Sequence, residues 1–88
     1  MKEKAIRIII KYKVELENHR MALDMNPNNN NVKKIMFYRD ELILEELQSL
    51  GYILKLEEQQ DNLSTVYQWL HETMQIAEAN IALATVGL

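Results

Sequence analysis

The stretch MNPNNNN, Met25 to Asn31, separates two segments rich in isoleucine, leucine and methionine, and it decides how the first half of the chain folds. Asn26-Pro27 resists continuation of a helix, because proline disfavours the α region for the residue that precedes it. Asparagine tolerates a positive φ and caps helices, so Asn30 or Asn31 can start a new helix. The stretch therefore predicts the turn of an antiparallel helical hairpin, although a run of polar side chains is also compatible with a binding loop.

The segment before this turn fits two patterns. Apolar and charged residues alternate from Ile6 to Leu16, which is typical of a strand. A helical arc also exists and extends further, to Leu23, and no turn signal interrupts the segment. A strand would need a partner, and the remaining candidate, Tyr52 to Glu57, would give an isolated and marginal pair. The helix is therefore favoured, and an α+β fold with strands near 5–16 and 52–57 is the alternative.

The segment after the turn predicts a second helix from Val32 to Leu50. Its apolar residues fall on one arc, and Gly51 follows the last of them, as expected for a glycine just beyond a helix end. Together with the first helix, this gives a hairpin that reverses about Asn28.

The last segment has the clearest helical pattern. Apolar residues recur in steps of four and three, the spacing of one helical face; they are Leu63, Tyr67, Leu70, Met74, Ala77, Ile81 and Ala84. Asp61 or Asn62 can cap the start. We predict a helix from about Leu63 to about Thr85, with an apolar surface wide enough to need two neighbouring helices. The whole chain, 1–88, is predicted to be a single all-α domain: a helical hairpin plus a third, longer helix.

Three polar residues interrupt the predicted apolar arcs: His19 in the first helix, and Arg39 and Glu46 in the second. A hairpin that reverses about Asn28 puts His19 level with residues 37–39 and Glu46 level with residues 10–12. Buried charges need partners, so we expect an interhelical polar cluster of these three residues. The sequence leaves open whether Arg39 and Glu46 pair within the chain or with a partner chain.

The residues that usually carry catalysis or bind metals are sparse. The chain has no cysteine and two histidines, with no paired metal-ligand spacing. Ser64, His71 and Glu78 are seven residues apart, which on one helix is roughly 10.5 Å, too far for a catalytic relay. The two glycines form no phosphate-binding loop. We therefore expect no catalytic, metal or cofactor residue, no cofactor, and a protein that is not an enzyme.

The net charge is −3 and unevenly distributed: residues 1–25 carry six Lys and Arg against four Asp and Glu, and residues 51–88 carry one against five. An acidic chain makes nucleic acid an unlikely partner, although Lys4, Arg7 and Lys11 form a basic line on the first helix. No apolar run is long enough for a membrane span and no leader pattern is present. These features, the absence of cysteine and the Ile-, Asn-, Lys- and Glu-rich composition predict a cytoplasmic protein from a bacterium or phage.

The carboxy-terminal end is apolar and uncharged from Asn80 to Leu88. Left in water it would form an exposed patch, so we expect a homo-oligomer through the apolar face of the last helix (Leu63, Tyr67, Leu70, Met74, Ala77, Ile81, Ala84). The sequence thus predicts a small non-enzymatic interaction protein, an adaptor, regulator or scaffold, with a possible protein partner. The alternative is a small nucleic-acid-binding regulator that uses the basic first segment.

Overall fold

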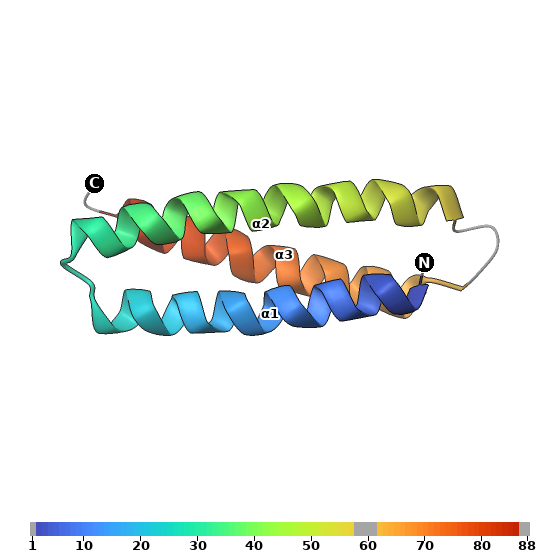
Figure 1. Ribbon diagram of the computed structural model, residues 1–88, viewed down its shortest axis with the longest axis horizontal. Coiled ribbons are helices and arrows are strands. Elements are labelled where there is room, and N and C mark those ends of the chain that lie inside the picture. Colours follow the sequence, from blue (N-terminus) through green and yellow to red (C-terminus); the bar gives the residue numbers. More distant parts are fainter. Residues whose placement is uncertain (1, 58–61, 87–88) are drawn as a thin grey trace.

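The computed structural model describes residues 2–57 and 62–86, which form three helices: α1 (Lys2–Met25), α2 (Asn30–Glu57) and α3 (Ser64–Thr85). The described residues contain no strand; residues 5–16 and 52–57 are helical. The all-α prediction is therefore confirmed, and the α+β alternative is wrong. The bundle is elongated, measuring 48 × 17 × 15 Å (Figure 1).

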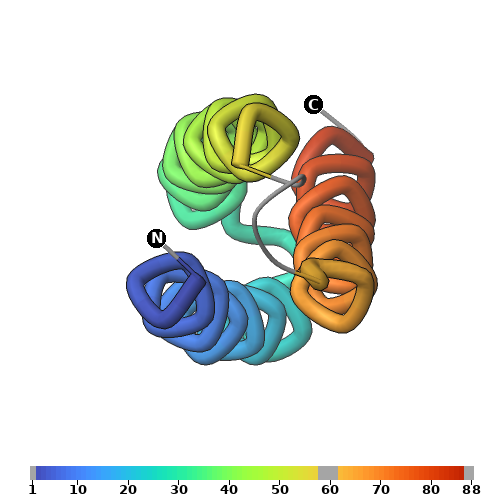
Figure 2. The backbone as a smooth tube through the Cα atoms, turned by 90° about the vertical axis from the view of Figure 1, so that its right-hand side faces the viewer, coloured from blue at the N-terminus to red at the C-terminus, as the bar shows by residue number. Residues whose placement is uncertain are grey.

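The helices α1 and α2 form the antiparallel hairpin, and α3 lies behind it in contact with both (Figures 1 and 2). This confirms that the last helix needs two neighbours. The core is a single cluster of buried side chains from all three helices and from Leu63, just before α3: Ala5, Ile9, Leu16, Ile43, Leu47, Leu50, Leu54, Leu63, Val66, Leu70 and Ala77. Burial of these side chains is the main stabilising contribution to the fold.

The helix α2 does not end at Gly51, where the sequence predicted its end, but continues to Glu57. Continuation places Leu54 in the core, fully buried. Gly51 instead lies where α2 approaches α3 closely, since a Cβ there would be 3.3 Å from Cδ2 of Leu70. Because α2 is extended, α3 is the shortest of the three described helices at 22 residues, whereas the sequence predicted it to be the longest.

Both ends of α3 are fixed by particular contacts. At its start, Leu63 occupies the N-cap position and is buried, so packing takes the place of a side-chain cap. The Asn62 side-chain oxygen accepts a hydrogen bond from the Ser64 backbone N–H at 3.2 Å, and Asp61, the other predicted cap, lies outside the described residues. At the other end, Lys33 Nζ on α2 donates to the Val86 carbonyl at 2.8 Å, a favourable place for a cation.

None of the described helices is both long enough and apolar enough to cross a membrane. Each of the three has a buried face and an exposed face that carries charged or polar side chains, the pattern of helices that pack on one side.

Candidate functional site

A buried polar cluster, formed by His19, Asp40 and Asn80, joins all three helices. His19 on α1 and Asp40 on α2 are hydrogen-bonded to each other through Nδ1 and Oδ1. Asn80 on α3 donates from Nδ2 to the backbone carbonyl of Leu16 on α1 at 2.8 Å. Glu15, one turn before His19, brings Oε1 to 3.7 Å from the other imidazole nitrogen, Nε2. The cluster therefore fixes α1 against both neighbouring helices.

The cluster is closed to solvent, and this burial affects the ionisation of its carboxyl group. Asp40 and Asn80 are fully buried and His19 nearly so. Desolvation raises the pKa of the Asp40 carboxyl above its ordinary value, and the hydrogen bond and charge of His19 oppose this rise in part. Asp40 Oδ2 and Asn80 Oδ1 have no hydrogen-bond partner among the described residues. The cluster is therefore sealed from solvent, and its hydrogen bonds link α1 to both of the other helices.

The predicted polar cluster of His19, Arg39 and Glu46 does not form as a unit. His19 lies on the buried face, as predicted, but its partner is Asp40, the residue after the predicted range. Arg39 and Glu46 are exposed. Glu46 lies at the expected level, since it lines a groove together with Tyr12 of α1.

This groove lies between α1 and α2 on the side away from α3 and has a volume of about 550 Å³. Lys4, Ile8 and Tyr12 line it from α1; Leu42, Glu45, Glu46, Ser49, Leu50 and Ile53 line it from α2. We call it the α1–α2 groove. Two of its apolar side chains are exposed: Leu42 by 60% and Ile53 by 43%.

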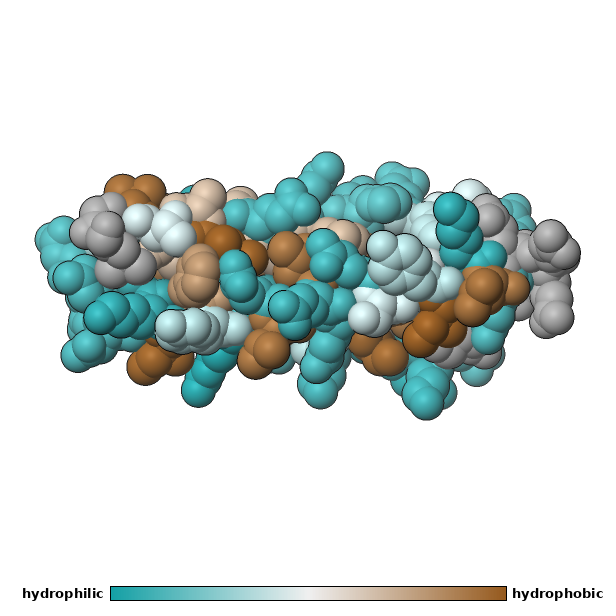
Figure 3. All heavy atoms as spheres, turned by 90° about the horizontal axis from the view of Figure 1, so that it is seen from above, coloured by the Kyte–Doolittle hydropathy of each residue, from teal (hydrophilic) through white to brown (hydrophobic). Residues whose placement is uncertain are grey.

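Further apolar side chains are exposed near the α1–α2 groove. Ile35 and Tyr38 precede Leu42 on α2 by seven and four residues, and Leu56 follows Ile53 by three, so all of them share one face of the helix. Figure 3, which views the molecule from the α2 side, shows apolar patches at several places along its length, separated by hydrophilic side chains. The outer face of α2 is therefore more apolar than a fully solvated helix face needs to be.

The interface predicted on the last helix lies partly inside the single chain. Leu63, Leu70, Ala77 and Ala84 are buried against α1 and α2 in the bundle core, while Tyr67, Met74 and Ile81 are half-buried. The four buried residues are consequently not on the surface that a second copy would meet. The same face buries Thr73 and Asn80, two polar residues that the apolar spacing does not predict to be buried.

A second groove, between α2 and α3, contains Tyr67 and Met74, two of the three half-buried residues of that predicted interface. It has a volume of about 530 Å³, and its lining includes Tyr52 and Lys55 from α2 with Tyr67, His71 and Met74 from α3. Among its lining residues Lys55 is the sole Lys, Arg, Asp or Glu. This groove therefore has almost no charged side chains, whereas the α1–α2 groove is lined by both basic and acidic residues.

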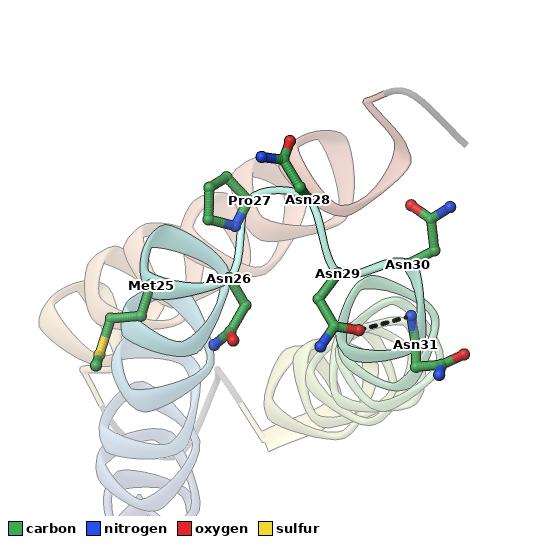
Figure 4. A pocket seen from close by; sticks show the side chains of 7 residues that line it. All are labelled: Met25, Asn26, Pro27, Asn28, Asn29, Asn30 and Asn31. Carbon is green, nitrogen blue, oxygen red and sulfur yellow. Dashed lines mark hydrogen bonds between the residues drawn. The ribbon is translucent and has the colours of Figure 1, made fainter.

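The Asn-rich turn forms a shallow hollow lined by Met25 to Asn31, with a volume of about 510 Å³ (Figure 4). Asn29 caps α2, because its side-chain oxygen accepts hydrogen bonds from the backbone N–H groups of Asn31 and Val32. The cap is thus one or two residues before the positions that the sequence predicts, Asn30 or Asn31. Asn26 donates to the Ala22 carbonyl at 2.8 Å and so closes α1. Asn28 and Asn30 point outward and do not converge on a common point, as expected of a connector.

The remaining candidates for chemistry are scattered. Among residues 2–57 and 62–86, no three His, Cys, Asp or Glu side chains are grouped so that they could hold a metal ion. Ser64, His71 and Glu78 are all exposed along α3. Lys4, Arg7 and Lys11 are exposed on one face of α1, and the Lys11 ammonium lies 5.5 Å from the ring centre of Tyr12.

Comparison with known proteins finds no protein family whose model matches this chain. No curated protein and no solved structure matches it either. The two grooves and the polar cluster are therefore the features of the molecule from which a function can be inferred.

Proposed function

We propose that this chain is a non-enzymatic protein that acts through helix–helix contacts, as an adaptor, regulator or scaffold, and that the α1–α2 groove is its contact surface. The observation that carries this proposal is the exposure of Leu42 and Ile53 in a groove between two long helices. An apolar groove flanked by polar side chains is the usual receptor for an amphipathic helix. The surface of the groove is also fixed from behind, because α3 supports both of its helices.

Self-association remains part of the proposal, but its surface differs from the one predicted from the sequence. Four of the seven residues expected at the interface are buried in the core. The α1–α2 groove offers exposed apolar side chains without any change in the fold of the monomer.

The proposal is tested by placing a photocrosslinking amino acid at position 53, in the groove, and expressing the protein in the cells from which the sequence comes. Gln68, exposed on α3, is the matched control position. We expect a discrete adduct from position 53 and a much weaker one from position 68. Equal adducts from both positions, or none from position 53, would contradict the proposal.

Nucleic-acid binding is the second candidate, because Lys4, Arg7 and Lys11 lie exposed on one face of α1. Three phosphate contacts give weak binding with a steep salt dependence. If this candidate is correct, the protein is retained on duplex DNA at about 0.15 M salt, and replacing the three residues with glutamate abolishes retention. Lys2, Lys13 and Arg20 provide the control, since they carry the same charge elsewhere on α1.

A further inference from the structure

The two walls of the α1–α2 groove carry opposite charges. Lys4 lines the groove from α1, and Arg7 and Lys11 share its helical face because they follow by three and seven residues. Glu45 and Glu46 line the groove from α2. All five side chains are exposed, so their charges face the solvent in front of the groove.

These charges are not neutralised within one chain. The ion pairs of the described residues are His19 with Glu15 and Asp40, and Arg20 with Asp24. None of these pairs crosses the groove. Lys4, Arg7 and Lys11 on one wall, and the two glutamates on the other, are consequently available to a partner.

The arrangement of the walls is self-complementary. Figure 1 looks onto this face, with α1 and α2 in front of α3. Because His19 pairs with Asp40 in an antiparallel hairpin, Lys11 lies level with about Gln48, within three residues of the level of Glu45 and Glu46. A two-fold axis along the bundle lays α1 of each copy over α2 of the other at the same level, so that Lys11 of each copy faces the acidic wall of the other.

We propose that the α1–α2 face binds a second copy of this chain in a two-fold dimer. In it Leu42 and Ile53 pack against the partner copy, and the basic wall of each copy lies on the acidic wall of the other. This deepens the proposed function by naming the partner. The α2–α3 groove does not offer the same arrangement, because its lining lacks acidic residues.

The size of the face agrees with this partner. The bundle is 48 Å long and 17 Å wide, so its broad side covers roughly 800 Å², the area that each partner buries in a typical stable complex. Exposed apolar side chains are spread along this length, from Ile35 to Leu56 on α2. A short peptide would cover part of the face, whereas a second three-helix bundle of equal length covers it all.

Charge exchange between the walls tests the proposal. One variant carries Lys4→Glu, Arg7→Glu and Lys11→Glu, and the other carries Glu45→Lys and Glu46→Lys. Sedimentation equilibrium of the wild type should show a dimer at micromolar to millimolar chain concentration. Each variant alone should associate about tenfold or more weakly, because like charges then face each other, and an equimolar mixture should again form a dimer of one copy of each.

A third variant controls for net charge. Lys2→Glu, Lys13→Glu and Arg20→Glu produce the same change in charge as the first variant but lie on a different face of α1. This control should dimerise like the wild type, and circular dichroism should show the same helix content in all variants. A wild type that stays monomeric at millimolar concentration, or a mixture that fails to associate, overturns the dimer.

The photocrosslink from position 53, which tests the proposed function, also distinguishes failure of the dimer from failure of that function. A monomeric wild type that still gives an adduct of another mass from position 53 would exclude the second copy and leave the interaction function standing. A monomeric wild type with no adduct would exclude both the dimer and the interaction function. One chain has a mass of 10.4 kDa. An adduct of twice that mass would support both the dimer and the interaction function.

Discussion

The helix α2 meets its two neighbours in different ways. Toward α3 it packs closely, with Gly51 so near that a Cβ would lie 3.3 Å from Leu70 Cδ2. Toward α1 it is held by the buried pair of His19 and Asp40, and beyond that pair the α1–α2 groove leaves Leu42 exposed. The difference indicates that close apolar packing stabilises the α2–α3 contact, whereas the α1–α2 contact is fixed by a polar pair and leaves apolar side chains exposed.

Replacing one leucine in each contact with alanine should give the largest difference in the free energy of unfolding. Leu70→Ala removes a buried side chain and should lower the free energy of unfolding by about 3 kcal/mol, within the range for buried leucines. Leu42→Ala, the same chemical change at an exposed site, should cost less than about 0.5 kcal/mol. Urea denaturation at a chain concentration too low for association gives both values. Similar losses at the two positions would mean that the contacts do not differ.

The polar pair should show a non-additive effect that an apolar contact does not show. His19→Leu leaves the buried Asp40 carboxyl without its donor and should cost about 2–3 kcal/mol. Adding Asp40→Leu removes the unsatisfied group, so the double variant should regain most of that loss. A double-mutant cycle of thermal or urea unfolding measures the coupling. If the double variant is no more stable than His19→Leu alone, the two residues do not act as a pair.

The pH dependence of the free energy of unfolding should reflect the titration of the buried Asp40 carboxyl group. Burial raises the pKa of Asp40 above its ordinary 3.8, so the folded chain binds this proton more tightly than the unfolded chain. The stabilisation by protonation is complete below pH 3.8 and is lost as the pH rises through the raised folded pKa. His19 and Glu15 from α1 and Asn80 from α3 are the groups that act on this carboxyl.

Asp40→Asn provides the reference, because its side chain has no proton to lose. Relative to this variant, the free energy of unfolding of the wild type should fall as the pH rises from 3.8 toward neutral. Urea titrations of both proteins across this window measure the difference. A wild type that gains stability relative to the variant over the same window would contradict the assigned direction.

Local signals predicted the elements of the fold but not all of their contacts. The Asn-Pro turn and the spacing from Leu63 to Ala84 are short-range features, and both gave the correct element. The predicted end of α2 was wrong, because a glycine in a sequence can mark either the end of a helix or a place where two helices approach closely. The choice between them depends on Leu70, which lies on another helix. The partner of His19 depends likewise on the register of the hairpin, which was predicted to within one residue.

The last helix was predicted correctly, but the burial of Thr73 and Asn80 shows that its buried face was not. Two lines of residues share Leu63, Leu70, Ala77 and Ala84: one passes through Tyr67, Met74 and Ile81, the other through Val66, Thr73 and Asn80. Both advance in helical steps, and hydrophobicity favours the first. The structure buries the second, because Asn80 finds the Leu16 carbonyl as a partner. This partner lies 64 residues away in the sequence, so no local pattern could indicate it.

The smallest expected effect tests the close approach of α2 to α3. Gly51→Ala should raise the free energy of unfolding by about 0.5 kcal/mol, because alanine restricts the unfolded chain and favours the helix. The new methyl group requires Leu70 to move by a few tenths of an ångström, and Leu70 borders the open α2–α3 groove into which it can shift. Gly51→Val, which is larger and β-branched, should lower stability instead. If alanine also destabilises, Leu70 is fixed more firmly than the groove implies, and the contrast between the two contacts of α2 becomes sharper.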